Sequence, residues 1–283
     1  MATTQREKAQ AFRELHSGPR ILVLPNVWDA ISARIFEAAG FAAVGTTSAG
    51  AANVLGYPDG QFAPREEVLF LVRRIANTVQ IPVTADIEAG YGADSVEEVV
   101  KTVQGVLDAG AVGINLEDSA FGACQLVDKG LQLEKIQAVR ALGESTGVPV
   151  VINARTDAFH LANLGTAAQF ALAVERANAY QKAGADSLFV PFVTDAAVIG
   201  DLVKAIGGPL NILAMPGTPP VSALVGLGVA RVSVGSGPHR ATVALTRRIA
   251  EELRDRGTYD SIMNETIPYP EVNALLAKLE RQS

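Results

Sequence analysis

Two acidic clusters follow apolar, strand-like runs, and their residue types could do chemistry. The first contains Asp86 and Glu88, and the second contains Glu117 and Asp118. Carboxylates at the end of a buried strand repel one another unless a cation lies between them, because water does not screen them there. Hard oxygen ligands gathered in this way suit Mg²⁺ or Mn²⁺ together with an anionic substrate. The alternative is that these acids cap helices or pair with surface lysines, and we favour the metal because buried acids usually need a partner.

Three further strand ends carry polar groups that could bind an organic acid. The segment Thr46–Gly50 offers hydroxyls and small residues whose backbone N–H groups can face an anion. The segment Asn153–Asp157 contains Arg155, whose guanidinium can grip a carboxylate through two bonds. Asn211 opens another apolar run, which leads into Met215–Thr218. Each group alone could be a cap or a structural ion pair, but their joint occurrence at strand ends indicates a binding site.

The elements that must position these groups alternate between short apolar runs and amphipathic stretches. Ala-Gly pairs close three of the amphipathic stretches just before a strand, which is a helix-stop signal. We predict strands at Ile21–Leu24, Ala43–Thr46, Val83–Ile87, Gly113–Leu116, Val150–Ala154, Ser187–Val190, Asn211–Ala214 and Arg231–Val234. We predict helices at Trp28–Ala39, Pro64–Val79, Ser95–Ala109, Leu133–Thr146, Thr166–Ala183, Ala196–Ile206, Pro220–Leu227 and Thr242–Arg256.

This alternation predicts an α/β fold of the (β/α)8 TIM-barrel type. Unbroken apolar strands that alternate with helices indicate a parallel sheet buried on both faces. Eight such units favour a closed barrel over an open sheet, and the active site of such a barrel lies where its strands end. No linker divides the chain, so we predict one domain over residues 1–283. It has a polar N-terminal leader at 1–20 and a C-terminal helical extension at about 258–283, with a helix at roughly Tyr269–Arg281.

Composition excludes several classes of protein. Of the 283 residues 48% are hydrophobic and 19% are charged, which is typical of a globular chain. The net charge is −6 without a dense basic run, so we expect no nucleic-acid partner. The first residues are polar and mixed in charge, which fits neither a signal peptide nor a membrane span. The single cysteine, Cys124, excludes an internal disulfide and suits a reducing cytoplasm, where we expect the protein.

From about Ile21 to the C-terminus the chain resembles the isocitrate lyase/phosphoenolpyruvate mutase superfamily. The pieces Asp86-Ile87-Glu88-Ala89-Gly90-Tyr91-Gly92 and Asn153-Ala154-Arg155-Thr156-Asp157 are specific when they occur in this order. The other matching pieces are Asn26-Val27-Trp28-Asp29-Ala30, Thr47-Ser48-Ala49-Gly50, Leu55-Gly56-Tyr57-Pro58-Asp59 and Leu116-Glu117-Asp118.

The resemblance implies a Mg²⁺ or Mn²⁺ enzyme that passes through the enolate of a pyruvate-like unit. It implies that Asp86 holds the metal directly, and that Glu88 and Glu117 hold it mostly through water. It implies that Asp59 is a catalytic residue that acts as a base or as a nucleophile-like partner. A cation beside an arginine would stabilise the developing oxyanion. The residues that it implies for binding the substrate carboxylates are Thr47, Ser48, Ala49, Arg155, which is also a catalytic candidate, and Asn211.

The loop after the fourth strand departs from the superfamily pattern. Isocitrate and methylisocitrate lyases carry a Lys-Lys/Arg-Cys-Gly-His loop there, whereas this chain has Ser119–Lys129. Cys124 lies near the lyase cysteine and is a candidate catalytic residue, but the flanking lysine, glycine and histidine are absent. A catalytic thiol needs neighbours that lower its pKa, and none is visible in the sequence. The asparagine- or threonine-bearing loop of phosphonopyruvate enzymes is missing too. We therefore interpret the chain as a non-classical member.

These observations predict a lyase that breaks a carbon–carbon bond, or a decarboxylase, acting on a small 2-oxo or 2-hydroxy carboxylate of the oxaloacetate or alkylmalate type. Carbon–phosphorus chemistry, as in phosphoenolpyruvate mutase or phosphonopyruvate hydrolase, is the first alternative. A 2-oxo acid binding barrel without turnover is the second. The loop Asp118–Leu131 discriminates between them because it must supply an acid or base if chemistry occurs. The sequence names neither that residue nor the substrate.

The three histidines and the last predicted helix also lead to expectations. We expect His16 to be solvated, His160 to be exposed or to face the barrel mouth, and His239 to be a weak candidate at a glycine-rich helix start. An apolar stripe in the last helix suggests that this helix crosses to a neighbouring subunit, as in the homotetramers (dimers of dimers) that the resemblance implies. The alternative is that it folds back over its own barrel floor. The stripe consists of Val272, Leu275, Leu276 and Leu279.

Overall fold

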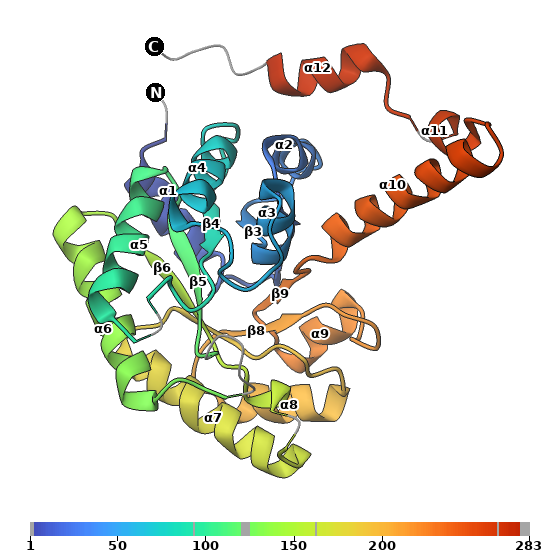
Figure 1. Cartoon of the computed structure of the whole chain (residues 1–283). Coiled ribbons are helices and arrows are strands. Elements are labelled where there is room, and N and C mark those ends of the chain that lie inside the picture. The colour runs from blue at the N-terminus through green and yellow to red at the C-terminus, as the bar shows by residue number, and fades with distance from the viewer. Residues whose placement is uncertain (1–2, 93, 120–124, 162, 265, 278–283) are drawn as a thin grey trace.

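The computed structural model describes residues 3–92, 94–119, 125–161, 163–264 and 266–277 and shows a parallel β-barrel surrounded by helices (Figure 1). Nine parallel strands follow one another in the order β1-β9-β8-β7-β6-β5-β4-β3-β2. The predicted TIM-barrel fold is therefore confirmed. The strands are β1 (Leu22–Leu24), β2 (Asn26–Val27), β3 (Val44–Thr46), β4 (Val83–Asp86), β5 (Gly113–Glu117), β6 (Val151–Arg155), β7 (Ser187–Phe189), β8 (Leu210–Leu213) and β9 (Arg231–Ser233).

The ninth strand arises because Pro25 divides the first predicted strand into two. β1 pairs with β9, while β2 pairs with β3 on the other side. Proline has no N–H to give to a sheet, but its carbonyl still accepts a hydrogen bond from the Gly45 N–H at 3.0 Å. β1 and β2 thus act as the two halves of one strand, and the barrel keeps eight sides.

The helices cover the outside of the barrel in the order expected from the sequence. Two differences affect the site: α3, which starts at Ser48, was not predicted, and α10 starts at Gly237 rather than at Thr242. The helices are α1 (Gln5–Glu14), α2 (Ala30–Ala38), α3 (Ser48–Leu55), α4 (Arg65–Ala76), α5 (Val96–Asp108), α6 (Lys129–Thr146), α7 (Thr166–Ala183), α8 (Ala196–Ala205), α9 (Val221–Leu227), α10 (Gly237–Asp255), α11 (Asp260–Met263), α12 (Tyr269–Ala277) and a short 3₁₀ helix, Ala158–His160.

The segment predicted to be a polar leader contains a helix that closes the bottom of the barrel. Thr4 caps α1, and its side chain and that of Glu7 each accept a hydrogen bond from the other's backbone. Ala9 and Phe12 on one face of this helix are fully buried among apolar residues at the lower ends of the strands. The barrel therefore has an apolar plug at its N-terminal end, which leaves the C-terminal end for a site.

Strand register decides which polar side chains face the barrel interior. Asp86 of β4 is level with Asn115 of β5, which is level with Asn153 of β6. Residues paired across parallel strands point to the same side of the sheet, so these three form one row. A chain of hydrogen bonds confirms it: Asn153 donates to Asn115 at 2.9 Å, and Asn115 donates to Asp86 at 3.0 Å.

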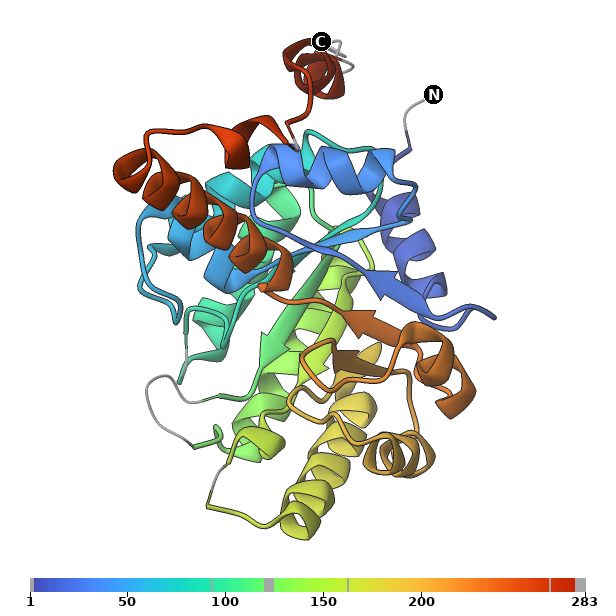
Figure 2. The same ribbon diagram turned by 90° about the vertical axis from the view of Figure 1, so that its right-hand side faces the viewer.

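The C-terminal arm, α10 to α12, leads away from the barrel before α12 returns to lie beside α2 (Figures 1 and 2). Arg34 Nε donates a 2.8 Å hydrogen bond to the Leu275 carbonyl. Val272 and Leu275 of the predicted stripe are half-buried, Leu276 is exposed, and Leu279 lies outside the described residues. Within the described part of the chain, no helix is long and apolar enough to cross a membrane.

Candidate active site

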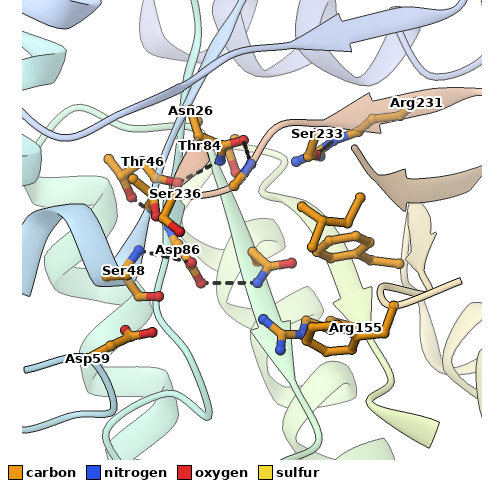
Figure 3. A pocket seen from close by; sticks show the side chains of 18 residues that line it. Asn26, Thr46, Ser48, Asp59, Thr84, Asp86, Arg155, Arg231, Ser233 and Ser236 are labelled. Atoms are coloured by element: carbon orange, nitrogen blue, oxygen red, sulfur yellow. Dashed lines mark hydrogen bonds between the residues drawn. The ribbon is translucent and has the colours of Figure 1, made fainter. Parts of the chain in front are cut away.

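A cavity of about 260 Å³ opens at the C-terminal ends of the strands, on the face where a barrel of this type carries its chemistry. Figure 3 shows that carboxylates, hydroxyls and guanidinium groups point into it from different strands. Its lining consists of Asn26, Gly45, Thr46, Thr47, Ser48, Ala49, Asp59, Thr84, Asp86, Asn115, Arg155, Phe189, Phe192, Leu213, Arg231, Ser233, Gly235 and Ser236.

Asp86, at the end of β4, is held by donors from both sides of the cavity (Figure 3). Its Oδ2 accepts from the Ser48 N–H at 3.1 Å, and its Oδ1 accepts from the Asn115 amide at 3.0 Å. Its own N–H donates to the Thr46 hydroxyl at 2.8 Å. The Ser48 N–H belongs to the first turn of α3, where backbone N–H groups favour negative charge. The carboxylate is therefore fixed in place before any ligand binds.

Glu88 is buried close to Asp86 and has an unfavourable environment for a negative charge. Its backbone has φ of 53°, a left-handed conformation that is rare outside glycine and often marks functional sites. Burial and the charge of Asp86 raise the pKa of Glu88 to about 8, although the Gln61 N–H donates to its carboxylate at 3.0 Å. A divalent cation near these two groups would relieve their repulsion.

Arg155, at the end of β6, forms ion pairs with two acids at once. Its Nε and Nη2 donate to the two carboxylate oxygens of Asp157 at 2.6 and 2.8 Å, and its Nη1 is 2.8 Å from Glu117 Oε2. Glu117 is its register partner on β5, which explains the second contact. Burial would lower the pKa of the arginine, but the two acids outweigh burial and raise it. The guanidinium is thus a permanent cation at the cavity wall.

Asp59 lies at the rim of the cavity on the loop between α3 and α4, beside Ser48 (Figure 3). Partial burial and the charge of Asp86 raise the pKa of Asp59, while the Ser48 hydroxyl and Arg155 act in the opposite direction. A carboxyl group whose pKa is raised in this way is suited to exchange protons with a substrate. The structure thus places Asp59 in the cavity, and its catalytic role stays a prediction.

Comparison with known proteins decides the family. The family model for phosphoenolpyruvate phosphomutase matches residues 12–254. The chain belongs to the phosphoenolpyruvate phosphomutase family. The resemblance to the isocitrate lyase/phosphoenolpyruvate mutase superfamily is thereby confirmed.

Named relatives in this superfamily cover nearly the whole chain. The oxaloacetate decarboxylase of Bradyrhizobium sp. is 33% identical over 89% of this chain and 85% of its own length. The 2-methylisocitrate lyase of Halalkalibacterium halodurans is 30% identical over 96% of this chain and 93% of its own length. A structure of phosphonopyruvate hydrolase in complex with oxalate and Mg²⁺ superimposes with a TM-score of 0.83 at 26% identity, covering 98% of this chain and 96% of the other.

The acidic residues of this family member fit a divalent cation with one direct carboxylate ligand. Within the described residues, no group of three or more His, Cys, Asp or Glu side chains is close enough to hold a metal by itself. Asp86 presents its carboxylate to the cavity, whereas Glu88 and Glu117 are not part of the cavity lining. Burial raises the pKa of Glu117 although Arg155 opposes the rise. A cation bound directly by Asp86, and through water by the two glutamates, would offset the negative charge of these three acids.

The structure brings most, but not all, of the predicted site residues into the cavity. Thr47, Ser48 and Ala49 line it together. Asn211 is fully buried and lies outside the lining, where it accepts a hydrogen bond from Ser233 at 3.2 Å. Cys124 lies outside the described residues.

Asp118, the fourth acid of the two clusters, has a structural environment. It follows Glu117 directly, and its fully buried side chain is held away from the cavity by α7. Its Oδ2 accepts from the Tyr180 hydroxyl at 2.6 Å and from Arg176 Nη1 at 3.1 Å. Its Oδ1 accepts from the Asp157 N–H at 2.9 Å. Asp118 therefore holds the backbone of Asp157, the residue that pairs with Arg155.

Several cavity residues were not singled out from the sequence. Thr84, Asn115 and Ser233 lie within apolar runs. Thr84 and Ser233 are each two positions from another residue of the cavity lining on the same strand, Asp86 and Arg231. The signal that could have found them is a polar residue at alternate positions of a strand that is otherwise apolar. The histidines contribute less: His160 is exposed, and His239 is buried edge-to-face against Trp28 at 5.4 Å, outside the cavity lining.

The prediction of a solvated His16 is wrong. Only 4% of this residue is exposed, because α1 carries it under the barrel. Its Nδ1 is 2.9 Å from the Phe12 carbonyl and its Nε2 is 3.3 Å from Arg231 Nη1. The protonated arginine must donate, so the histidine is neutral, with its proton on Nδ1. Burial and the charge of Arg231 lower the pKa of His16 to about 3.

We expect His16 to make folding stability sensitive to acid. Between its ordinary pKa of 6.5 and about 3, the unfolded chain binds a proton that the folded chain cannot bind, so stability falls as the pH drops through this window. The loss is about 1.4 kcal/mol per pH unit, or roughly 2 kcal/mol by pH 5. Urea unfolding at pH 7.5 and 5.0 should show that His16→Gln loses about 2 kcal/mol less than the parent. Equal losses in the two proteins would contradict the assignment.

Proposed function

We propose that the protein is a Mg²⁺-dependent enzyme that breaks or forms a carbon–carbon bond of a small 2-oxo or 2-hydroxy carboxylate through an enolate. A lyase or decarboxylase of the oxaloacetate or alkylmalate type is the form that we favour. One observation carries the proposal. Asp86, the α3 N-terminus, Arg155 and Asp59 face a single cavity from four different segments. The comparison supports it, since named relatives are an oxaloacetate decarboxylase and a 2-methylisocitrate lyase.

The chain's own residues supply binding and proton transfer in this proposal. Backbone N–H groups at the start of α3 and the guanidinium of Arg155 would hold the carboxylate next to the carbonyl. When bound at Asp86, the cation would supply positive charge that stabilises an enolate oxygen. Asp59, whose pKa is raised, would accept or donate the proton at the adjacent carbon. Phe189 and Phe192 flank Arg155 at 5.8 and 5.7 Å and would limit access of water.

A panel assay tests this function. The purified protein with Mg²⁺ is given oxaloacetate, methylisocitrate-like acids, alkylmalates and phosphonopyruvate, and pyruvate release is followed for each. We expect turnover of an oxaloacetate-type or alkylmalate-type acid, and inhibition by oxalate, which resembles the enolate of pyruvate. Uncatalysed oxaloacetate decarboxylation by Mg²⁺ alone is the blank. Lack of turnover of every carbon–carbon substrate would contradict the proposal.

The same panel separates the two alternatives. Turnover of phosphonopyruvate alone would indicate carbon–phosphorus chemistry. The similarity of the fold to phosphonopyruvate hydrolase is the reason for testing this alternative. Tight Mg²⁺-dependent binding of oxalate without any turnover would indicate a binding barrel. We expect the loop that follows Asp118 to supply a second acid or base beside Asp59, so Ala substitutions at residues 119–131 should lower turnover but not oxalate affinity if the protein is an enzyme.

We further propose that the C-terminal arm supports a homotetramer by packing on a neighbouring barrel. Exposed apolar side chains continue along this arm, including Tyr259, Met263 and Tyr269 at 59, 70 and 79% exposure. Such a series is usually covered by a partner. The contact of α12 with α2 of its own chain supports the alternative, in which the arm folds back.

Deletion of residues 268–283 should lower the oligomeric state. Light scattering at matched concentrations measures the mass of the full chain and of the truncated chain, and circular dichroism shows whether the barrel remains folded. Leu276→Ala, which trims one exposed position of α12, is the milder variant. A truncated chain with the parental mass, or a full chain that is monomeric, would contradict the proposal.

A further inference from the structure

A buried arginine at the floor of the cavity has no role in the function proposed above. Arg231 points from β9 into the barrel, is only 2% exposed and belongs to the cavity lining. In Figure 3 it lies with Ser233 on the far side of the cavity from Asp59. Arg155 also projects into the cavity, so the cavity contains two separate guanidinium groups.

Among the described residues, no hydrogen bond of Arg231 goes to a carboxylate, and only the charge of Asp86, which is not in contact with it, offsets its own. A guanidinium has five N–H donors. Within the described residues, Nε donates to the Ser233 hydroxyl at 3.1 Å and Nη1 donates to the neutral His16 at 3.3 Å, and no carboxylate forms an ion pair with it. Burial lowers the pKa of Arg231 to about 9, which still leaves it charged at neutral pH. An unpaired buried cation is costly, so such a group usually meets an anion.

Two further buried polar groups, one in the cavity lining and one beside Arg231 on β8, also lack partners among the described residues. The Thr84 hydroxyl lines the same cavity, is buried, and has no hydrogen-bond partner in the described part of the chain. The amide nitrogen of Asn211, the register partner of Arg231 on β8, is likewise buried without a partner among the described residues. A hydroxyl, an amide and the remaining guanidinium N–H groups are all able to donate. The Thr84 hydroxyl and the guanidinium line the cavity and match the acceptor oxygens of a carboxylate there, whereas Asn211 lies behind the lining.

We propose that Arg231, aided by Thr84, is a second anion subsite at the cavity floor, which binds the far carboxylate of a ligand that carries two. One carboxylate would lie at the proposed reaction centre of Ser48, Asp86 and Arg155, and the other would extend downward to Arg231. This inference rests on the proposed function for the position of the first carboxylate. His16 serves as the positioning residue, because its contact holds the guanidinium from below.

A matched pair of stable acids tests the floor subsite without turnover. Malate and 2-hydroxybutyrate share one end and differ in having a carboxylate or a methyl group at the other. Calorimetric titration of the Mg²⁺-loaded protein should show that malate binds about tenfold or more tightly, the scale of a charge-assisted hydrogen-bonded pair. Arg231→Gln should remove this preference, Arg231→Lys should retain part of it, and oxalate should report on the other end of the site.

Each other outcome counts against the subsite. A parent protein without a preference for malate, or an Arg231→Gln variant that keeps it, would show that no second carboxylate reaches Arg231. If Arg231→Gln lowers the affinity for malate, 2-hydroxybutyrate and oxalate equally, then Arg231 only stabilises the site as a whole or offsets the charge of Asp86. If Arg231→Gln does not fold, Thr84→Val, which removes one hydroxyl at nearly constant volume, should reduce the preference about threefold, and an unchanged preference would overturn the proposal.

The experiment separates this inference from the proposed function. If the parent turns over none of the carbon–carbon substrates but prefers malate through Arg231, the proposed function fails and the floor subsite stands. If the parent turns over an oxaloacetate-type acid but the preference does not depend on Arg231 or Thr84, the function stands and the subsite fails.

Discussion

Asp86→Ala should abolish specific binding of divalent cations and with it the Mg²⁺-dependent activity. The carboxylate that is lost is the one that Ser48 and Asn115 hold toward the cavity. Loss of a metal that supplies several kcal/mol of charge stabilisation corresponds to a rate decrease on the order of a thousandfold. Calorimetry with Mg²⁺ and Mn²⁺, and kinetics with the substrate that the panel identifies, measure the two effects.

The fold of the Asp86→Ala variant should remain intact, because removing Asp86 also removes repulsion from Glu88. Thermal unfolding checks this point. Asp201→Ala, a change at an exposed aspartate on α8, is the control and should leave metal affinity at the parental value. Unchanged Mg²⁺ affinity in Asp86→Ala would contradict the prediction that Asp86 binds the metal directly. Glu117→Gln should weaken binding less, since its contact is expected through water.

Arg155→Lys should lower kcat/KM about 30-fold or more, which corresponds to roughly 2 kcal/mol of transition-state stabilisation. A lysine keeps the charge but has no planar fork. The structure shows where the fork acts: two nitrogens hold Asp157 and the third reaches Glu117. A single ammonium group cannot hold both acids and still meet a substrate carboxylate, so the variant should lose both orientation and affinity.

A comparison of two arginines makes this test specific. Arg140 also pairs with an acid, Asp186 at 2.6 Å, but lies outside the cavity. Arg140→Lys should therefore change kcat/KM by less than about threefold, since it alters an ion pair without touching the site. Parental kinetics in Arg155→Lys would mean that another residue clamps the carboxylate. Equal effects of the two substitutions would mean that the loss reflects general destabilisation.

The sequence was sufficient to predict the barrel and the residues at the ends of its strands. Alternating strand-like and helix-like runs specify the (β/α)8 architecture, and every strand of such a barrel ends on the same face. Asp86, Ser48 and Arg155 could therefore be placed in one mouth, and the structure places all three in the cavity lining. Positions at strand ends are local features, so their neighbours follow from topology alone.

Side-chain direction and long-range contact were decided only by the tertiary structure. Glu117 and Asp118 look alike in sequence, but strand alternation turns the first toward Arg155 and the second toward Arg176. Pro25 divided a strand that the sequence showed as one, because its two halves pair with different neighbours.

The floor of the cavity is the clearest example of a long-range contact that the sequence did not predict. His16 and Arg231 are 215 residues apart in the chain, and they meet because β9 pairs with β1 to close the barrel while α1 plugs it from below. No local pattern encodes such a contact, since it depends on closure of the whole sheet. The sequence by itself determined which residues stand at the mouth of this barrel. The closed structure determined which charges are buried beneath it, because only packing removes a charge from water and assigns its partner.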